Sequence, residues 1–151
     1  MKPNLTKSFR GKKESQMSTE QNQTVFRQVI TEAFNKGNYD VLYNCFRPDF
    51  IEHQFGLHPT IEGFKGDIQF LRTAFPDLSL TIEDMVADGD KVWARMIARG
   101  TNIGGFMGPP NGKSFEATVF DMCRFKDGKI IEHWGSPDRF AILAQLELLS
   151  K

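Results

Sequence analysis

Asp121 is the residue whose type and position most clearly predict chemistry in this sequence. The stretch 114–125 alternates in the manner of a strand, and Asp121 falls on the same side as the apolar Ala117 and Val119. A carboxylate on an apolar face costs free energy unless it is hydrogen-bonded, protonated or used in function. Such surroundings favour a general acid or base that gives a proton to oxygen or takes one from carbon. In the simpler alternatives, this face is exposed near the end of the sheet, or Asp121 only accepts a hydrogen bond from the indole of Trp134.

The partners of Asp121 depend on the register of one predicted hairpin. Asp127-Gly128 is typical of a two-residue type I′ turn, which joins this strand to a second strand over residues 129–134. Regular pairing from that turn places Asp121 opposite Trp134, and directly paired residues share a face. His133 then falls opposite Met122 on the other face, where we expect a structural role or a subunit contact. The face that includes Asp121 is predicted to hold Phe115, Ala117, Val119, Cys123, Ile130, Glu132 and Trp134.

His53 is the second candidate for proton transfer. It lies in a predicted strand over residues 49–55 on a face with two apolar residues, where it could also orient a substrate carbonyl. A buried histidine bonded to the backbone is an equally good interpretation. Glu52-His53 and Glu132-His133 look like pairs of metal ligands, but neighbours on a strand point to opposite faces, so we expect no metal site.

The loop 100–112 is rich in glycine and lies between two predicted strands. Its end, at residues 108–114, is one residue too short for a phosphate-binding loop, and its prolines remove backbone donors. We predict instead a mobile lid over a pocket, in which Phe106 and Met107 contact a flat apolar ligand.

The apolar periodicity predicts helices first, then strands, then one closing helix. Gly37, Pro48 and Pro76 end the first three helices, and Thr60 caps the third. No alternation of strand and helix is present, so we predict an α+β domain with helices packed on one face of a mostly antiparallel, twisted sheet. The expected elements are helices over 25–34, 41–46 and 61–75, strands over 49–55, 78–83, 91–99, 114–125 and 129–134, and a helix that Ser136-Pro137-Asp138 opens.

Length and charge exclude several classes of protein. The 151 residues indicate one globular domain, and 19 Lys+Arg against 19 Asp+Glu give no positive surplus for nucleic acid or an anionic membrane. No apolar run is long enough to span a bilayer, and no secretory signal is visible, so we expect a cytoplasmic protein. Residues 1–20 are expected to form a disordered extension, with Met17 resembling a natural second start, and residues 21–151 to form the single domain.

Four stretches of the sequence resemble the SnoaL-like polyketide cyclases, also called ester cyclases. They are residues 75–78, 82–92, 100–113 and 121–134, and the resemblance runs in unbroken order over residues 22–149. It implies the nuclear transport factor 2-like fold, a cone-shaped α+β barrel in which N-terminal helices pack on a curved sheet around a deep pocket.

The resemblance also implies a reaction. The family closes a ring of an aromatic polyketide by intramolecular aldol condensation, without metal or organic cofactor, and its strand aspartate acts as general acid or base. That aspartate matches Asp121 here. Family members often carry histidine after the Gly-Thr of the loop, and this chain has Asn102 there instead.

We therefore expect a cofactor-independent enzyme that closes a ring in a polyketide-type ester, with Asp121 and His53 as the catalytic residues. The ligand is expected to be a small hydrophobic or aromatic carbonyl compound, contacted by Trp134, Asn102, Phe106, Met107, Val119 and Trp93. The same acid and pocket would serve a ketosteroid-isomerase-like isomerase or a dehydratase. A non-catalytic ligand-binding module is the alternative from a different class.

The opposite face of the same hairpin is also apolar. It carries Phe120, Met122, Ile131 and His133 in the predicted register. Helices can cover only one face of a sheet, so two apolar faces predict a homodimer that forms through the sheet.

Overall fold

The protein is described here by a computed structural model, which describes residues 18–150. The predicted disordered extension therefore lies largely outside the described residues, although residues 18–20 already belong to the first helix. That helix spans residues 18–28 and continues with π-helical geometry as η1. The other elements follow in the order η1 (Val29–Asn35), α2 (Val41–Cys45), β1 (Phe46–Glu52), α3 (Ile61–Ala74), β2 (Ser79–Asp88), β3 (Lys91–Thr101), β4 (Ser114–Lys126), β5 (Lys129–Pro137) and α4 (Arg139–Gln145).

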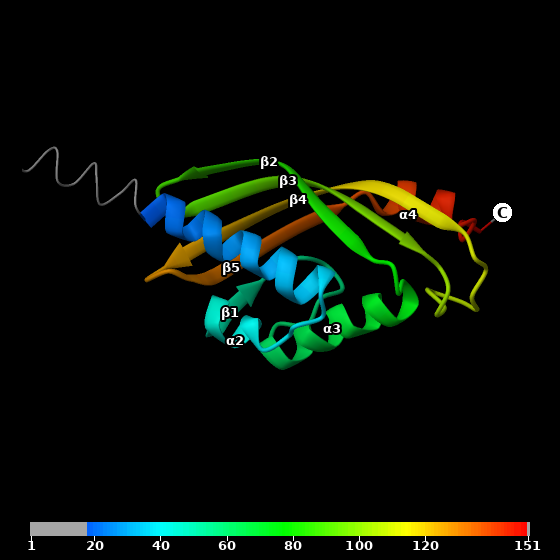
Figure 1. Ribbon diagram of the computed structural model, residues 1–151, viewed down its shortest axis with the longest axis horizontal. Helices are drawn as coiled ribbons and strands as arrows, with labels where there is room; N and C mark the ends of the chain where they lie inside the picture. Colours follow the sequence, from blue (N-terminus) through cyan, green and yellow to red (C-terminus); the bar gives the residue numbers. More distant parts are fainter. Residues whose placement is uncertain (1–17, 151) are drawn as a thin grey trace, which may run out of the picture.

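The five strands form one mixed sheet in the order β1-β5-β4-β3-β2. Only β1 and β5 run parallel, and the other pairs are antiparallel. Figure 1 shows the first helix, α2 and α3 gathered on one side of the sheet, while the long strands β2 to β5 curve over them. The largest buried cluster fills this layer with residues from helices and strands, among them Phe26, Leu42, Phe64, Ile68, Met96 and Cys123. The predicted α+β architecture is confirmed.

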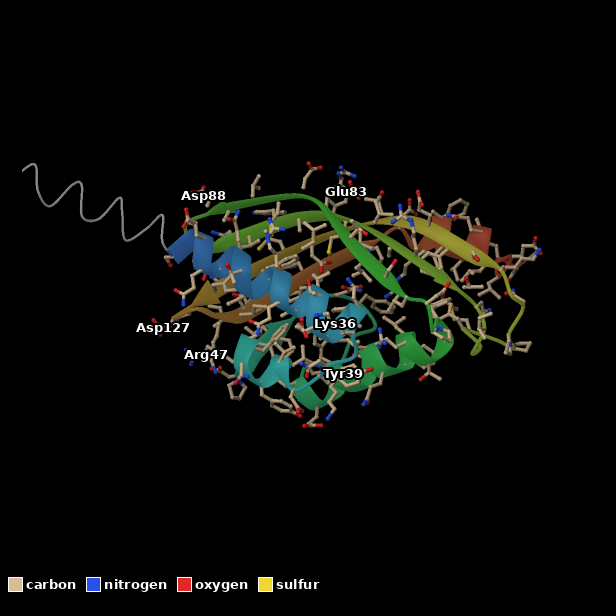
Figure 2. All side chains as sticks on the ribbon, in the orientation of Figure 1. Lys36, Tyr39, Arg47, Glu83, Asp88 and Asp127 are labelled. Atoms are coloured by element: carbon tan, nitrogen blue, oxygen red, sulfur yellow. The ribbon has the colours of Figure 1, made fainter. Side chains whose placement is uncertain are left out.

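Local signals fix the ends of several elements as predicted. Gly37 follows the first helix with a φ of 73°, a value that glycine adopts at little cost. The hydroxyl of Thr60 accepts a hydrogen bond from the Gly63 N–H at 3.0 Å and caps α3. Asp127 and Gly128 both have positive φ, as a type I′ turn requires. In Figure 2 the exposed Asp127 and Asp88 mark the two hairpin turns at one end of the molecule.

Two predicted boundaries are wrong. The first strand begins at Phe46 and contains Pro48, because β1 lies at the edge of the sheet, where a residue without an N–H is tolerated. The last helix is capped by Asp138 and not by Ser136. The Asp138 N–H still bonds the Thr118 carbonyl at 2.9 Å, so the strand continues to the residue before the cap. None of the helices within residues 18–150 has the length and apolar character needed to cross a membrane.

The predicted register of the β4–β5 hairpin is wrong beyond its second pair. Phe125 lies opposite Ile130 as expected, but Arg124 then lies opposite Glu132, so Ile131 is the extra residue of a β-bulge. Because side chains alternate along a strand, a shift of one residue moves every later side chain of β5 to the other face. His133 therefore shares the face of Asp121, and Trp134 lies opposite Met122 on the outer face.

Candidate active site

A cavity of about 400 Å³ lies between the sheet, α3, α4 and the loop 102–113. Its walls are mainly apolar, which suits the size and lining of a site for a small organic ligand. α3 and α4 contribute Phe64, Ile68, Leu71, Ile142 and Leu143. The cavity has few polar side chains, and they are Gln54, Asp67, Asp121, His133 and Arg139.

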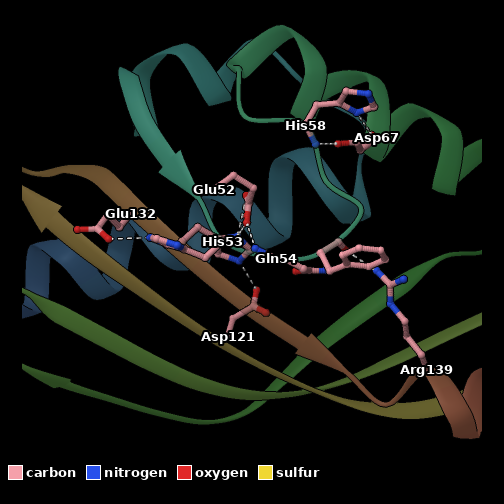
Figure 3. A network of polar contacts seen from close by, with 10 residues as sticks. Glu52, His53, Gln54, His58, Asp67, Asp121, Glu132 and Arg139 are labelled. Atoms are coloured by element: carbon pink, nitrogen blue, oxygen red, sulfur yellow. Dashed lines mark hydrogen bonds and ion pairs between the residues drawn. The ribbon is translucent and has the colours of Figure 1, made fainter.

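The polar end of the cavity is a buried chain of three titratable side chains. His133 Nε2 donates to Asp121 Oδ2 at 3.2 Å, and His133 Nδ1 donates to Glu52 Oε1 at 2.8 Å. The three side chains come from β4, β5 and β1, which are neighbours in the sheet, and only 13%, 6% and 1% of the side-chain surface of Asp121, His133 and Glu52 is exposed. Figure 3 shows Glu52 and Asp121 at the two ends of this chain.

The two carboxylates keep His133 protonated. Burial alone lowers the pKa of His133, but the hydrogen bonds and charges of Asp121 and Glu52 outweigh that effect and raise its pKa to about 10. The imidazolium thus donates from both ring nitrogens and gives Asp121 a cationic neighbour. The mainly apolar face expected for Asp121 included Glu132 and Trp134, and this expectation is wrong, because the β-bulge turns both residues outward and brings the His133 cation to that face.

Asp121 nevertheless keeps one oxygen free. Its Oδ1 is buried and has no hydrogen-bond partner among the described residues, while Oδ2 bonds His133. A buried oxygen without a partner is rare in folded proteins and needs an explanation. Since Asp121 lines the cavity, the free oxygen is placed to accept a proton or hydrogen bond from a ligand.

Gly135 provides the space in which Asp121 meets a second polar group. A Cβ at Gly135 would lie 1.9 Å from Oε1 of Gln54 and 2.8 Å from Oδ1 of Asp121, so these side chains occupy the space that a larger residue would need. The amide of Gln54 makes no hydrogen bond of its own with the described residues and also lines the cavity. The site therefore combines a free carboxylate oxygen with a free amide group.

Comparison with known proteins places the chain in a family. The model of the SnoaL-like polyketide cyclases matches residues 24–146, which is most of the chain. The chain belongs to the SnoaL-like polyketide cyclase family. The α+β barrel is accordingly of the nuclear transport factor 2-like type. The comparison with curated proteins found no match.

Solved structures support the assignment to the SnoaL-like family. IdmH from Streptomyces antibioticus, a candidate polyketide cyclase, is 39% identical, with 83% of this chain and 98% of that chain covered and a TM-score of 0.75. TsrD from Streptomyces laurentii is 30% identical, with 86% and 97% covered and a TM-score of 0.78. AclR from Streptomyces galilaeus, a candidate hydroxylase, is 24% identical, with 88% and 89% covered and a TM-score of 0.77, and shares the fold.

In this SnoaL-like domain, the predicted base and three of the predicted ligand contacts line the cavity. Three other residues predicted for the site, His53, Trp93 and Trp134, lie on the outer face of the sheet. Asp121, Val119, Phe106 and Met107 line the cavity. His53 instead bonds Glu132 at 2.8 Å and stacks on Trp134 with ring centroids 4.3 Å apart. Trp93 is 52% exposed and faces outward as well. The alternation predicted for β1 holds, but Glu52 and Gln54 point inward and His53 points outward (Figure 3).

Asn102 organises the loop of the SnoaL-like domain and does not line the cavity. It is fully buried, its Oδ1 accepts from the N–H groups of Gly105 and Phe106 at 3.1 and 2.9 Å, and its Nδ2 donates to Asn111. The side chain thereby fixes the segment that carries Phe106 against Phe75 in the cavity wall.

Replacing Asn102 with alanine should destabilise the protein. Two backbone N–H groups would lose their acceptor, and each unpaired buried group costs about 1–3 kcal/mol, so we expect a loss of about 2 kcal/mol or more. Urea unfolding measures this loss. Asn44→Ala, at an exposed position in α2, is the control and should change the free energy of unfolding little. Equal effects of the two substitutions would contradict the role given to Asn102.

The charged state of His133 predicts how stability depends on pH. Its pKa rises from 6.5 to about 10 on folding, so its contribution is complete below pH 6.5 and is lost as the pH rises toward 10. We expect the free energy of unfolding to fall by up to about 1.4 kcal/mol per pH unit in that range. Urea unfolding between pH 6.5 and 8.0 measures the slope, because above this range the cysteine thiols, whose pKa is 9.0 when unfolded and higher when folded, add a slope of the same sign.

His133→Gln should remove this slope. His58→Gln is the matched control, because the His58 side chain is 70% exposed and lies outside the buried chain. The control should keep the slope of the wild type. An unchanged slope in His133→Gln would mean that another group titrates in this range.

Proposed function

We propose that this protein is a cofactor-independent cyclase that closes a ring by intramolecular aldol condensation of a polyketide-type carbonyl compound. The observation that carries the proposal is the free Oδ1 of Asp121 in the wall of an apolar cavity. Membership in the SnoaL-like family and the similarity to IdmH support a cyclase-like activity.

In the proposed reaction, Asp121 acts first as a base. Oδ1 takes the acidic proton from a carbon between two carbonyl groups, and the C–H electron pair forms an enolate. The enolate carbon attacks a second carbonyl of the same molecule, which forms the C–C bond and an alkoxide. Asp121 returns its proton to that alkoxide oxygen, so the step needs no oxidant or further reactant.

The neighbours of Asp121 have supporting roles in this proposal. The His133 imidazolium keeps the ionised carboxylate oriented through Oδ2, and Glu52 orients His133 in turn. Gln54 lines the cavity beside Asp121, and in this proposal the NH2 group of its amide donates to the enolate oxygen while the proton moves. The apolar walls hold the chain folded for attack, which supplies much of the acceleration.

Hydrogen–deuterium exchange tests the proposal. The wild-type protein is incubated in D₂O with a panel of aromatic 1,3-dicarbonyl esters, and NMR follows exchange at the acidic carbon. We expect exchange well above the buffer rate. Tight binding of an ester with no exchange of any probe would contradict the proposal and favour the non-catalytic binding module.

We also propose that the outer face of the sheet binds a second copy of the chain. Val86, Trp93 and Phe120 are 63%, 52% and 56% exposed there. Val86, Trp93, Met122 and Trp134 lie side by side across four strands, so they form one continuous apolar row. A row of this kind on a soluble domain is typical of an interface.

Sedimentation velocity tests this interface. The wild type should sediment as a dimer, and Trp93→Glu should sediment as a monomer because it places a charge in the centre of the row. Ile103→Glu is the control, since Ile103 is 57% exposed but lies in the loop after β3. A monomeric wild type would contradict the proposal.

A further inference from the structure

Arg139 is held at the wall of the cavity by the loop between β1 and α3. Its Nη2 donates to the carbonyl of Phe55 at 2.6 Å, and its guanidinium carbon lies 5.7 Å from the centroid of the Phe55 ring. Gly56, with a φ of 87°, packs so closely that a Cβ there would lie 3.2 Å from Nη2. The guanidinium is thus fixed in position before any ligand binds.

No carboxylate neutralises Arg139 among the described residues. Its neighbour Asp138 caps α4 by accepting from the Ala141 N–H at 2.9 Å, and Asp67 in the same cavity bonds His58 at 2.7 Å. The arginines of the sheet, Arg47, Arg95, Arg99 and Arg124, each pair with a carboxylate. Arg139 therefore differs from them in keeping the N–H groups of Nε and Nη1 for another partner.

The surroundings of Arg139 favour an anion as that partner. Arg139 is exposed and lines the cavity beside the apolar Ile142 and Leu143, so its guanidinium is open to a charge-assisted hydrogen bond with a ligand. Asp121 would instead repel an anion, because two carboxylates share one imidazolium there. Figure 3 shows Arg139 apart from Asp121, so one ligand could place different groups at the two positions.

We propose that Arg139 binds a carboxylate of the substrate, which makes the substrate an aromatic carbonyl compound that carries a free carboxylate. The geometry suits a planar carboxylate, because the arginine fork offers parallel N–H donors. This assignment rests on the proposed function, because it takes the cavity to be the place where the substrate binds. It adds a fixed orientation, with the carboxylate at α4 and the acidic carbon at Asp121.

A matched pair of probes tests the assignment. Isothermal titration calorimetry compares 3-hydroxy-2-naphthoate with its methyl ester, which differ in charge but share the aromatic system. The wild type should bind the carboxylate about tenfold more tightly, the ratio that corresponds to one charge-assisted hydrogen bond. Arg139→Gln should bind both probes equally, and Arg139→Lys should retain part of the preference.

Two further variants separate this inference from its alternatives. Asp121→Asn should keep the preference for the carboxylate, so a loss of exchange with an intact preference would refute catalysis without refuting the subsite. Phe55→Leu keeps the backbone carbonyl that holds Arg139 and should also keep the preference. Thermal melting shows whether each variant is folded. Equal affinity for both probes in the wild type, no binding of the carboxylate, or an unchanged preference in folded Arg139→Gln would overturn the assignment.

Discussion

Asp121→Asn should reduce the catalysed exchange of an aromatic 1,3-dicarbonyl ester by at least about 100-fold, the usual lower limit for loss of a general base. The amide has nearly the shape of the carboxylate and can still accept from His133, but it cannot take a proton from carbon. The expected loss is therefore chemical and not structural. NMR measurement of the exchange rate in D₂O, with both proteins at the same concentration, gives the ratio directly.

Asp84→Asn is the matched control for this substitution. Asp84 is also a strand aspartate that bonds a cationic side chain, since Arg95 Nε donates to it at 2.7 Å, but it is exposed and lies away from the cavity. Exchange should stay close to the wild-type rate in this variant. If Asp121→Asn also exchanged the probe at the wild-type rate, Asp121 would not be the base.

Gly135→Ala should have the second large effect, although it adds only one methyl group. The new Cβ would lie 1.9 Å from Gln54 Oε1 and 2.8 Å from Asp121 Oδ1, so both side chains must move. Displacement of a reacting group by about 1 Å can cost about 100-fold in rate, and we expect a loss of that order. Overpacking should also lower the free energy of unfolding by about 1–3 kcal/mol. Exchange assays and urea unfolding measure the two effects.

Gly66→Ala tests whether the loss is specific to the site. A Cβ at Gly66 would meet nothing within 4 Å, and the residue lies within α3, where alanine is favoured over glycine by about 1 kcal/mol. This variant should be as stable as the wild type or more stable, with normal exchange. A tolerated Gly135→Ala would show that the cavity can rearrange around the added methyl group.

Much of the fold follows from local chemistry. Gly37, Thr60 and Asp127-Gly128 act through backbone requirements that can be recognised in the sequence, and the structure confirms each of them. Asp121 was recognisable because a carboxylate interrupts an apolar strand pattern, and it does line the cavity. These features depend on residues close together in the chain.

The partners of Asp121 were not predictable in the same way. The bulge at Ile131 has no glycine or proline to mark it, and it pairs His133 with Glu52 of β1, a strand far away in the sequence. Arg139 was also missed, because its lack of a carboxylate partner depends on where Asp67 and Asp138 make their bonds. Both features come from the packing of distant segments.

The bulge at Ile131 decides the sign of the charge beside Asp121. Glu132 and His133 are adjacent in β5, and the strand turns one of them inward and the other outward. In a regular hairpin Glu132 would face inward with Asp121, and two carboxylates near each other would compete to hold a proton. With the bulge, a cation takes that place and Glu132 bonds His53 outside. Deletion of Ile131 from β5 would therefore place a second carboxylate beside Asp121 in place of the cation, and it would also turn the later side chains of β5 to the opposite face.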